Sequence, residues 1–257
     1  MLNHTFVILA YGKSPYLEMC VCSLMRQTLG GSHLLISTST DNSHIRDIAY
    51  RYGIPVFVHD GHGLGSDWND GMACAETDYV TLVHQDDIYM KYYLDAVMTA
   101  FLNHPKGIIA FTDYAEIRDG RFVPTGVHIK IKQAMLKAVD VAPYNETLRR
   151  RVLSFGNPIC CPSVTYNREL IGNIEFDETW ETNIDWAMWE RISTMDGAFL
   201  HIPEKLVGHR IHEDSTTTAV IDGGSRGRED LEMLKRFWPK SAADFLYRFY
   251  ALGEKTN

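Results

Sequence analysis

The sequence predicts an α/β fold with a mostly parallel central sheet whose faces are covered by helices. The first 112 residues alternate short apolar runs with longer segments that favour helices. The clearest run, Tyr79–Val83, is apolar or β-branched throughout, and polar residues follow it at once. Such a run is typical of a strand that is buried on both faces of a sheet. Because strands that alternate with helices pair through helical crossovers, this order indicates a parallel sheet.

The elements of this first part follow one another without long gaps. Ser14 is expected to cap the first helix, with Pro15 at its first helical position. The expected strands are Thr5–Ala10, Leu34–Ser37, Pro55–His59, Tyr79–Val83 and Ile108–Thr112. The expected helices are Ser14 to about Gln27, His44–Tyr52, Trp68–Ala75 and Tyr92–Leu102.

After Thr112 the alternation ends. Asp119-Gly120, at the centre of Ile117–Val123, predicts a hairpin. The segment Glu213–Gly227 is rich in Ser, Thr and Gly and is expected to be a loop, flexible or ordered by a ligand. The other expected elements are a helix at Asn145–Ser154, a strand at Ser163–Tyr166, a helix at Ile184–Thr194, strands at Phe199–Ile202 and Lys205–Ile211, and two helical segments in Arg228–Leu252 that Pro239 separates.

Composition excludes several classes of protein. With 45% hydrophobic and 23% charged residues, the 257-residue chain has the composition of an ordinary globular protein. A formal net charge of −8 without a long basic run argues against nucleic acid as a partner. Five cysteines without paired CxxC motifs argue against a disulfide framework or a zinc site. The cysteines are expected to be buried, reduced thiols, which indicates the cytosol, so we expect a cytoplasmic protein. Neither a signal peptide nor a run of ~20 apolar residues is found.

A polar cluster, His84, Gln85, Asp86 and Asp87, follows the run Tyr79–Val83 directly. It is therefore expected at the carboxyl edge of the sheet, where open α/β sheets bind ligands. Two adjacent carboxylates repel each other unless a cation compensates them. The cluster predicts a site for a divalent metal and a diphosphate. The alternative, that the acidic residues only begin the next helix, stays open from this stretch alone.

A second carboxylate, Asp185, lies in the first turn of the helix expected at Ile184–Thr194. There it could project into a cleft and act as a general base toward a hydroxyl group. The alternative is a capping box, Thr182-x-x-Asp185, in which the carboxylate only binds backbone amides. The residues by themselves favour the cap.

Three further features bear on function. The spacing of Gly61, Gly63, Gly65 and Gly71 fits neither a dinucleotide fingerprint nor a P-loop, which disfavours both classes. In the strand Lys205–Ile211 and just beyond it, Arg210 and His212 point the same way and could reach a metal or a phosphate. This signal is weak by itself, because a lone histidine near a loop is more often a surface residue. The tail mixes basic and aromatic residues, which suits a membrane interface, or else a helix packed on the protein's own core.

Taken together and in this order, these segments resemble family 2 glycosyltransferases of the GT-A fold. No single motif is specific, and the resemblance covers about residues 4–216. Its motifs are the opening run Phe6–Leu29 with Ser-Leu-x-x-Gln-Thr at Ser23–Thr28, then Ser39-Thr40-Asp41, Asn69-x-Gly71, His84-Gln85-Asp86-Asp87, Asp185-Trp186 followed by Arg191, and His209-Arg210-Ile211-His212.

The resemblance implies an inverting transfer of a sugar from a nucleotide diphosphate-sugar to an acceptor hydroxyl. The donor that it implies in the first place is a UDP-sugar. It makes Asp185 the catalytic base rather than a cap, and Asp86 a ligand of Mn²⁺ or Mg²⁺, with Asp87 and His212 as further ligands. The ring of Tyr11 would stack on the nucleotide base. The implied donor-binding residues are Ala10, Tyr11, Gly12, Ser37, Asp41, Asn69, His84, Gln85, Asp86 and Arg210, and the implied acceptor-binding residues are Gly156, Asn157, Glu181, Asn183 and Trp186.

The resemblance also implies a division into a donor lobe (1–112), a lobe for the acceptor and the base (113–220) and a helical tail (221–257). Its usual setting is the assembly of surface polysaccharide or glycolipid at the inner face of the cytoplasmic membrane. The acceptor would be a saccharide or a lipid-linked saccharide, and the tail could make a peripheral membrane contact.

The chain departs from the family pattern at three positions. His84 replaces the first Asp of the metal motif, Ile36-Ser37 replaces an acidic pair that usually binds uracil, and Ile184 replaces an acidic neighbour of the base. These changes leave open a catalytically inactive module that only binds nucleotide sugars. A nucleotidyltransferase and a dehydrogenase have less support.

Overall fold

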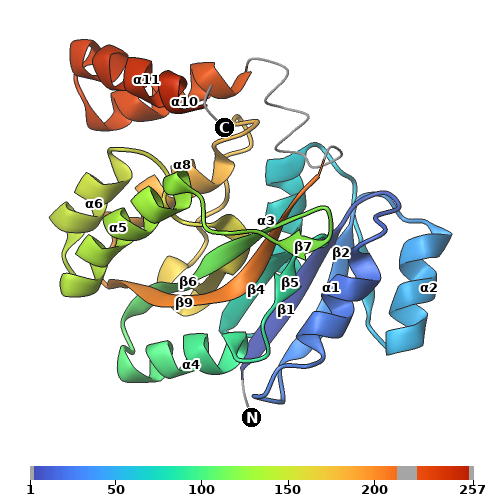
Figure 1. Cartoon of the computed structure of the whole chain (residues 1–257). Helices are drawn as coiled ribbons and strands as arrows, with labels where there is room; N and C mark the ends of the chain where they lie inside the picture. The colour runs from blue at the N-terminus through green and yellow to red at the C-terminus, as the bar shows by residue number, and fades with distance from the viewer. Residues whose placement is uncertain (1–2, 213–224, 255–257) are drawn as a thin grey trace.

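A nine-stranded sheet runs through the middle of the computed structural model, which describes residues 3–212 and 225–254 (Figure 1). The strands lie in the order β3-β2-β1-β4-β8-β6-β9-β5, and β7 pairs with β6. Their bounds are β1 His4–Ala10, β2 His33–Thr38, β3 Val56–Val58, β4 Tyr79–His84, β5 Ile88–Tyr89, β6 Gly107–Arg118, β7 Arg121–Phe122, β8 Val164–Asn167 and β9 Ala198–Ile211.

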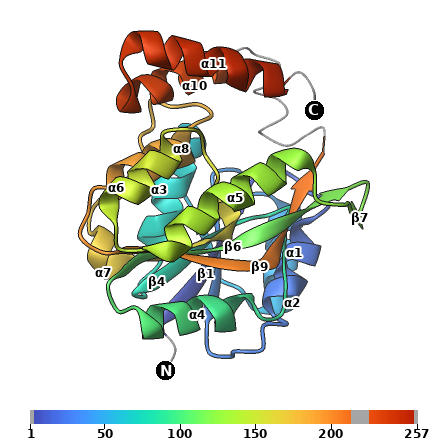
Figure 2. The same cartoon turned by 60° about the vertical axis from the view of Figure 1, so that its left-hand side comes forward.

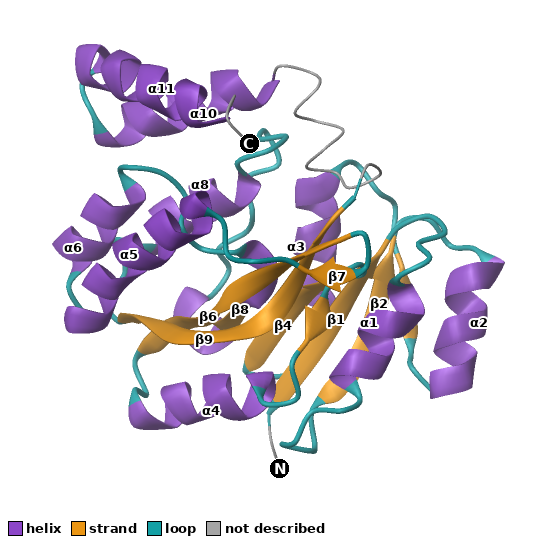
Figure 3. Ribbon diagram, in the orientation of Figure 1, coloured by secondary structure: helices purple, strands orange, loops and turns teal. Residues whose placement is uncertain are grey.

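Helices cover both faces of this sheet (Figure 3). Helices α1, α2 and α4 share a hydrophobic core with one face, and α3, α6 and α8 share a second core with the other. The bounds are α1 Leu17–Leu24, α2 Ser43–Tyr52, α3 Leu64–Cys74, α4 Tyr93–Asn103, α5 Val127–Val141, α6 Glu146–Leu153, α7 Arg168–Ile171, α8 Ile184–Ile192, α10 Ser225–Phe237 and α11 Lys240–Glu254, with a short 3₁₀ helix, η1, at Cys161–Ser163.

The two cores explain why the first strands are apolar throughout. In β1 the side chains of Phe6 and Ile8 enter one core, whereas Val7 between them enters the other. In β4, Leu82 and Val83 divide in the same way. Successive side chains of a strand point to opposite faces, so each strand needs apolar residues at every position when both faces are covered. The predicted α/β class with a mostly parallel sheet is confirmed.

The strand order corrects the predicted topology beyond β4. The fifth predicted strand, Ile108–Thr112, is the middle of the longer β6, and β8 lies between β4 and β6, antiparallel to both. The predicted strands Phe199–Ile202 and Lys205–Ile211 form one strand, β9, whose register against β6 shifts near Asp113. Pairing depends on contacts between distant segments, which a local pattern does not contain.

Local patterns succeed where the backbone itself sets the conformation. The predicted hairpin is confirmed, with Ile117 paired to Phe122. Asp119 and Gly120 have φ angles of 51° and 73°, the positive values that a two-residue type I′ turn requires. In contrast, α1 begins at Leu17 rather than after Ser14, because the Ser14 hydroxyl accepts from the Tyr16 amide (3.2 Å) in a turn that precedes the helix.

Four of the described elements escaped prediction: β5, α5, α7 and η1. The two-residue strand β5 is too short to show a period, although it pairs with β9. Helix α5 begins with apolar residues at every second position, a pattern typical of strands. Its buried residues are Ile129, Leu136 and Val139, and their spacing of seven and three residues is a helical signal.

The tail forms two helices, α10 and α11, on either side of Pro239, as predicted. They lie beyond α8, outside the helices that cover the sheet (Figure 2). The expected loop at 213–227 falls on residues 213–224, which lie outside the described residues, and on the start of α10. The boundary predicted after residue 112 falls inside β6, so the two predicted lobes share one sheet. Within residues 3–212 and 225–254, no helix is both long and apolar enough to cross a bilayer.

Candidate active site

A cluster of possible metal ligands lies at the carboxyl end of β4. His84, Asp86 and Asp87 each offer a ligand atom, and these atoms all lie within 4.8 Å of one another. His212, just after β9, brings its Nε2 atom to 2.9 Å from Asp86 Oδ2. We call His84, Asp86, Asp87 and His212 the metal corner. The structure thus joins the three predicted metal ligands and adds His84, which had been predicted as a donor contact.

Asp87 ties the metal corner to β9. Its side chain is fully buried and accepts hydrogen bonds from the Arg210 amide (2.8 Å) and from His209 Nδ1 (3.1 Å). Burial acts to raise the pKa of Asp87, but the neighbouring His209 and the hydrogen bonds hold it below its ordinary value. Asp87 is therefore a carboxylate that fixes the end of β9 beside β4.

The side chain of Arg210 is bound within the fold rather than exposed to solvent. Its side chain is buried, its Nε atom donates to the backbone oxygen of Asp86 (2.8 Å), and its guanidinium lies 4.2 Å from the centre of the Tyr16 ring. In this way the guanidinium group of Arg210 holds the loop that carries Asp86. Its predicted contact with the donor would have to be made through this loop.

The donor set fits a divalent cation. His84 Nε2 is buried and has no hydrogen-bond partner among the described residues, which leaves a lone pair or a proton unsatisfied beside Asp86. A mixed set of imidazole and carboxylate ligands suits first-row transition metals such as Mn²⁺ better than Mg²⁺, which prefers oxygen ligands.

Asp185 lies in the first turn of α8 with both carboxylate oxygens oriented. Oδ1 accepts from the Trp186 amide and Oδ2 accepts from Asn157 Nδ2, each at 2.7 Å. Burial raises the pKa of Asp185, although these hydrogen bonds and the charges of Lys132 and Arg226 act against the rise. Each oxygen keeps capacity for a further hydrogen bond, so the carboxylate can still receive a hydroxyl proton.

The capping-box alternative for Asp185 is wrong. The N-cap of α8 is Asn183, whose side chain makes no capping hydrogen bond within the described part of the chain. The Thr182 hydroxyl donates instead to Glu229 of α10 (2.6 Å), as do the amides of Thr182 and Asn183. The start of α8 is thus capped from another helix, and Asp185 binds one backbone amide, that of Trp186, together with the side chain of Asn157.

The segment that precedes η1 carries a thiol, Cys160, whose pKa is affected by both Asp87 and Asp185. Burial raises the pKa of the Cys160 thiol, and the charges of both Asp87 and Asp185 raise it further. Cys160 therefore lies within electrostatic range of both carboxylates. Lys132 of α5 acts on the same thiol and on Asp185, so α5 also borders this region.

The predicted donor residues at the end of β1 form a connected group. Gln85 binds the backbone of Tyr11 at both ends, accepting from its amide (3.1 Å) and donating to its carbonyl (2.9 Å). The Tyr11 side chain is 64% exposed and is free to stack on a planar ligand. Gly12 has a φ of 62° and donates its amide to the Thr40 hydroxyl (2.6 Å), which turns the chain beside Tyr11.

Other predicted donor residues are used within the fold. Ser37 is only 1% exposed, and Ala10 is buried as well. The amide group of Asn69 donates to Phe176 and Glu178 and accepts from the Phe176 amide (2.7 Å). Asp41 is ion-paired with an arginine on the surface (2.7 Å). Among the described residues, none of these side chains forms a hydrogen bond with the metal corner.

Some of the predicted acceptor residues lie at Asp185, whereas others are used within the fold. Asn157 contacts Asp185 directly, and Gly156 precedes it with a φ of 141° that favours glycine. Trp186 belongs to the core, since it is fully buried and its indole N–H donates to the Leu153 carbonyl (3.1 Å). Asn183 is buried and donates to Asp230 (2.7 Å), whereas the side chain of Glu181 is exposed.

Sequence reasoning missed Lys132, Arg226 and Glu229. Lys132 lies on α5, which was not predicted, and no local motif marks Arg226 or Glu229 in α10. Their positions follow from the docking of α5 and α10, which no short pattern reveals.

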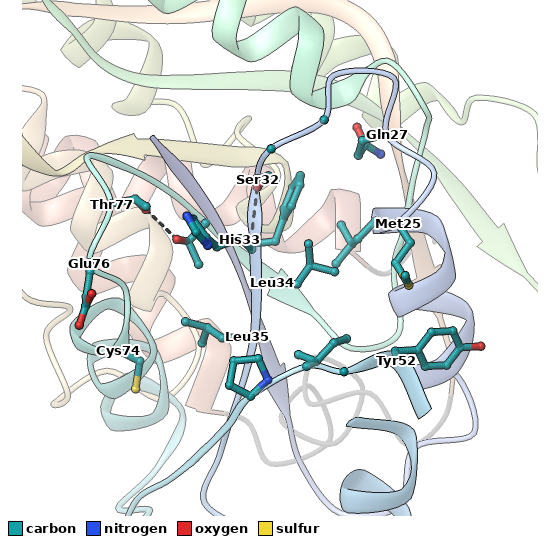
Figure 4. Close-up of a pocket in the computed structure, with 18 of the residues that line it drawn as sticks. Met25, Gln27, Ser32, His33, Leu34, Leu35, Tyr52, Cys74, Glu76 and Thr77 are labelled. Atoms are coloured by element: carbon teal, nitrogen blue, oxygen red, sulfur yellow. Dashed lines mark hydrogen bonds between the residues drawn. The ribbon is translucent and has the colours of Figure 1, made fainter. Parts of the chain in front are cut away.

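A cavity of about 840 Å³ lies at the opposite end of the sheet (Figure 4). Its lining includes Gln27, His33, Glu76 and Thr77, near the amino ends of β2 and β4. It includes none of the predicted site residues. Ligands of open α/β sheets bind at the carboxyl ends of the strands, so this cavity is separate from the candidate active site.

Several solved structures of glycosyltransferases match this fold. That of S. aureus TarS 1–349 matches with a TM-score of 0.68 at 14% identity, over 96% of this chain and 69% of that chain. The mannosyltransferase PcManGT from Pyrobaculum calidifontis, in complex with GDP-Man and Mn²⁺, matches with 0.62 at 12% identity, over 95% and 69%. Glucosyl-3-phosphoglycerate synthase from Mycobacterium tuberculosis, in complex with Mn²⁺ and UDP-Glc, matches with 0.59 at 14% identity, over 91% and 79%. The fold is that of the GT-A glycosyltransferases.

The sequence places the chain more narrowly within this class. The family described as Glycosyl transferase family 2 matches residues 5–173, most of the chain. The chain therefore belongs to glycosyl transferase family 2, and the resemblance seen in its motifs is confirmed. No curated protein matches the sequence significantly. As a member of this family, the protein is a glycosyltransferase that uses a nucleotide sugar.

Proposed function

We propose that this protein is an inverting, divalent-metal-dependent glycosyltransferase. It would transfer a sugar from a nucleoside diphosphate-sugar, a UDP-sugar in the first instance, to a hydroxyl group of a saccharide or a lipid-linked saccharide. The observations that carry the proposal are the cluster of His84, Asp86 and Asp87 at the end of β4 and the carboxylate of Asp185, which Trp186 and Asn157 hold in one orientation. Complexes of S. aureus TarS with UDP-GlcNAc and of the mycobacterial synthase with UDP-Glc support a uridine nucleotide.

Asp185 is the proposed general base. It takes the proton of the acceptor hydroxyl while that oxygen forms a bond to the anomeric carbon of the sugar. The bond from the anomeric carbon to the diphosphate breaks on the opposite face, so the configuration inverts. Asn157 and the Trp186 amide hold the carboxylate in one orientation, which supplies the positioning that such a transfer needs.

His84 and Asp86, with Asp87 and His212, are the residues that would hold Mn²⁺ or Mg²⁺. When bound, the cation neutralises negative charge on the departing nucleoside diphosphate. The exposed ring of Tyr11 is placed to stack on the nucleotide base, and its backbone is fixed by Gln85. The proposed division of labour puts the donor on residues 1–112 and the acceptor on residues 113–220.

The test is a panel of nucleotide sugars with Mn²⁺ or Mg²⁺, scored for thermal stabilisation and for slow release of nucleotide by hydrolysis. We expect stabilisation by one donor class only when the cation is present. Asp86→Ala should lose this stabilisation, whereas Asp95→Ala, on the exposed side of α4, should keep it. Stabilisation of Asp86→Ala equal to that of the wild type would refute the metal role.

The panel also tests the inactive-module alternative. Binding of donor and metal without nucleotide release, even when saccharide acceptors are supplied, would support a module that only binds nucleotide sugars. Release that increases with one acceptor would exclude it and would identify the acceptor class.

The proposed setting is the assembly of surface polysaccharide or glycolipid at the cytoplasmic face of a membrane. The tail offers Phe245, which is 59% exposed, and the exposed Arg248 on the same helix. Aromatic and basic residues together suit an anionic bilayer surface. Co-sedimentation with phosphatidylglycerol vesicles should fall in the double variant Phe245→Ala, Arg248→Ala. Unchanged sedimentation would refute the contact through α11.

A further inference from the structure

The C-terminal helix α10 reaches the start of the helix that carries Asp185 (Figures 1 and 2). Glu229 of α10 accepts hydrogen bonds from the amides of Glu181 (2.8 Å), Thr182 (2.8 Å) and Asn183 (3.0 Å). It also accepts from the Thr182 hydroxyl (2.6 Å). We call this set of contacts the Glu229 clamp.

The clamp is buried and has support on both sides. Glu229 is 6% exposed, and its neighbour Asp230 accepts from Asn183 Nδ2 (2.7 Å). One turn further along α10, Met233 and Leu234 enter the same core as α8. Helix α10 is thus seated on α8 by apolar contacts, and Glu229 fixes the direction in which α8 begins.

The chemistry of the clamp suits a helix start. Asn183 is the N-cap of α8, and Glu181 and Thr182 come just before it, so the amides that Glu229 binds lie at the positive end of the helix dipole, where a negative charge is stabilised. Burial acts to raise the pKa of Glu229, but the amide and hydroxyl hydrogen bonds hold it below its ordinary value, so the group is a carboxylate at neutral pH. An uncharged side chain at this position cannot accept all of these hydrogen bonds.

Asp185 follows the clamp by two residues. Its carboxylate must meet both Asn157 and an acceptor hydroxyl, and a change in the path of residues 181–183 would move it away from both. A misplacement of about 1 Å in such a transfer costs on the order of a hundredfold in rate. The clamp therefore sets the geometry of the proposed base without contacting it.

We propose that Glu229 is a positioning residue for transfer, which holds residues 181–183 so that Asp185 faces the acceptor hydroxyl. The proposal rests on the proposed function for its rate effect, but not for its structural part. The C-terminal helices are then a working part of the acceptor side of the site. If they were only an appended stabilising element, removing the carboxylate would lower stability and leave turnover unchanged.

The experiment compares Glu229→Gln with Glu232→Gln in the full chain. Glu232 lies on the same helix but is exposed and pairs with Lys235 (2.6 Å), so its substitution is a matched control. We expect kcat to fall about tenfold or more in Glu229→Gln, while KM for the donor stays within about twofold, because the donor site lies on other elements. Glu232→Gln should match the wild type in both constants.

Hydrogen–deuterium exchange supplies a readout that does not need activity. The amides of Glu181, Thr182 and Asn183 should exchange faster in Glu229→Gln and at the wild-type rate in Glu232→Gln. Thr182→Val, which removes only the hydroxyl contact, gives a milder change in the same direction and serves if Glu229→Gln does not fold.

The outcomes separate the two proposals. If the wild type transfers no sugar from any donor, the proposed function fails while the exchange data still test the clamp. If the wild type is active and Glu229→Gln shows faster exchange with an unchanged kcat, positioning is refuted. Unchanged exchange at residues 181–183 would refute the clamp itself.

Discussion

At the scale of single residues, the surroundings of Asp185 set the pH at which it can accept a proton. Burial raises its pKa, whereas Trp186, Asn157 and the cations Lys132 and Arg226 lower it. A base must be ionised, so activity should rise with pH through this pKa. The balance between burial on one side and the hydrogen bonds and nearby cations on the other therefore decides where the acid limb of the pH profile lies.

The substitution Lys132→Met should move this limb to higher pH. Removing a cation that lowers the pKa of Asp185 makes the carboxylate harder to ionise. The measurement is kcat/KM against pH, with Lys130→Met, exposed on the same helix, as the control. An acid limb that stays at the wild-type pH in Lys132→Met would contradict this reading of the site.

His84 gives a second prediction at this scale. As an imidazole beside Asp86 with an unsatisfied nitrogen, it should favour Mn²⁺ over Mg²⁺. In His84→Ala the affinity for Mn²⁺ should fall about tenfold or more, read from the electron paramagnetic resonance signal of free Mn²⁺ without any substrate. His104→Ala, at the far end of α4, should bind Mn²⁺ as the wild type does. An equal affinity for Mn²⁺ in both variants would refute the role of His84 as a metal ligand.

Single residues also mark the limit of sequence reasoning. Asp86 and Asp185 could be singled out because each follows a recognisable strand end or helix start. Ser37 and Trp186 were drawn from the same motifs, yet both are buried. The burial of a residue depends on which residues pack against it, and the local sequence does not reveal these.

At the scale of elements, α8 is held at both ends by charged side chains. Glu229 binds its amino end, and Arg149 of α6 binds the carbonyls that follow its carboxyl end. The Arg149 guanidinium donates to Ser193 (2.7 Å), Gly197 (2.5 Å) and Met195, and the side chain is 2% exposed. Both ends of α8 are thus fixed by residues far from it in sequence.

The substitution Arg149→Met should lower the free energy of unfolding by about 3 kcal/mol, because buried carbonyls lose a charged donor. Urea unfolding measures it. The control Arg121→Met, on the exposed hairpin, should change it by less than about 0.5 kcal/mol. Equal effects of the two substitutions would show that the carbonyls after α8 do not depend on Arg149.

Elements could be predicted where their own residues determine the backbone conformation. Asp119-Gly120 dictated a turn, and the apolar runs dictated β1 and β4. Helix α5 begins with the alternation of a strand, and β5 exists only because β9 offers it a partner.

At the scale of the whole molecule, the tail is part of the folded core. Met233 and Leu234 are buried against α8 and its neighbours, and Phe237 and Trp238 pack around them. Phe237 and Trp238, at the end of α10 and just after it, were among the aromatic residues that suggested a membrane contact, and they serve this packing instead. The parallel half of the sheet could be predicted because its strands alternate with helices along the chain, whereas the docking of the tail and the insertion of β8 rest on distant contacts.

Met233→Ala should lower the free energy of unfolding by about 3 kcal/mol, since it leaves a cavity in the core. Leu102→Ala, at a position that is 78% exposed, should change it little. Both variants should unfold in a single transition, which tryptophan fluorescence measures. A separate early transition for the tail would contradict a shared core.

The central claim is that Asp185 takes the proton of the acceptor. The most direct measurement is the turnover of Asp185→Asn, an isosteric change, together with its affinity for the donor and Mn²⁺. The account predicts wild-type donor affinity and a turnover at least about a thousandfold lower. Turnover close to that of the wild type in this variant would contradict the account.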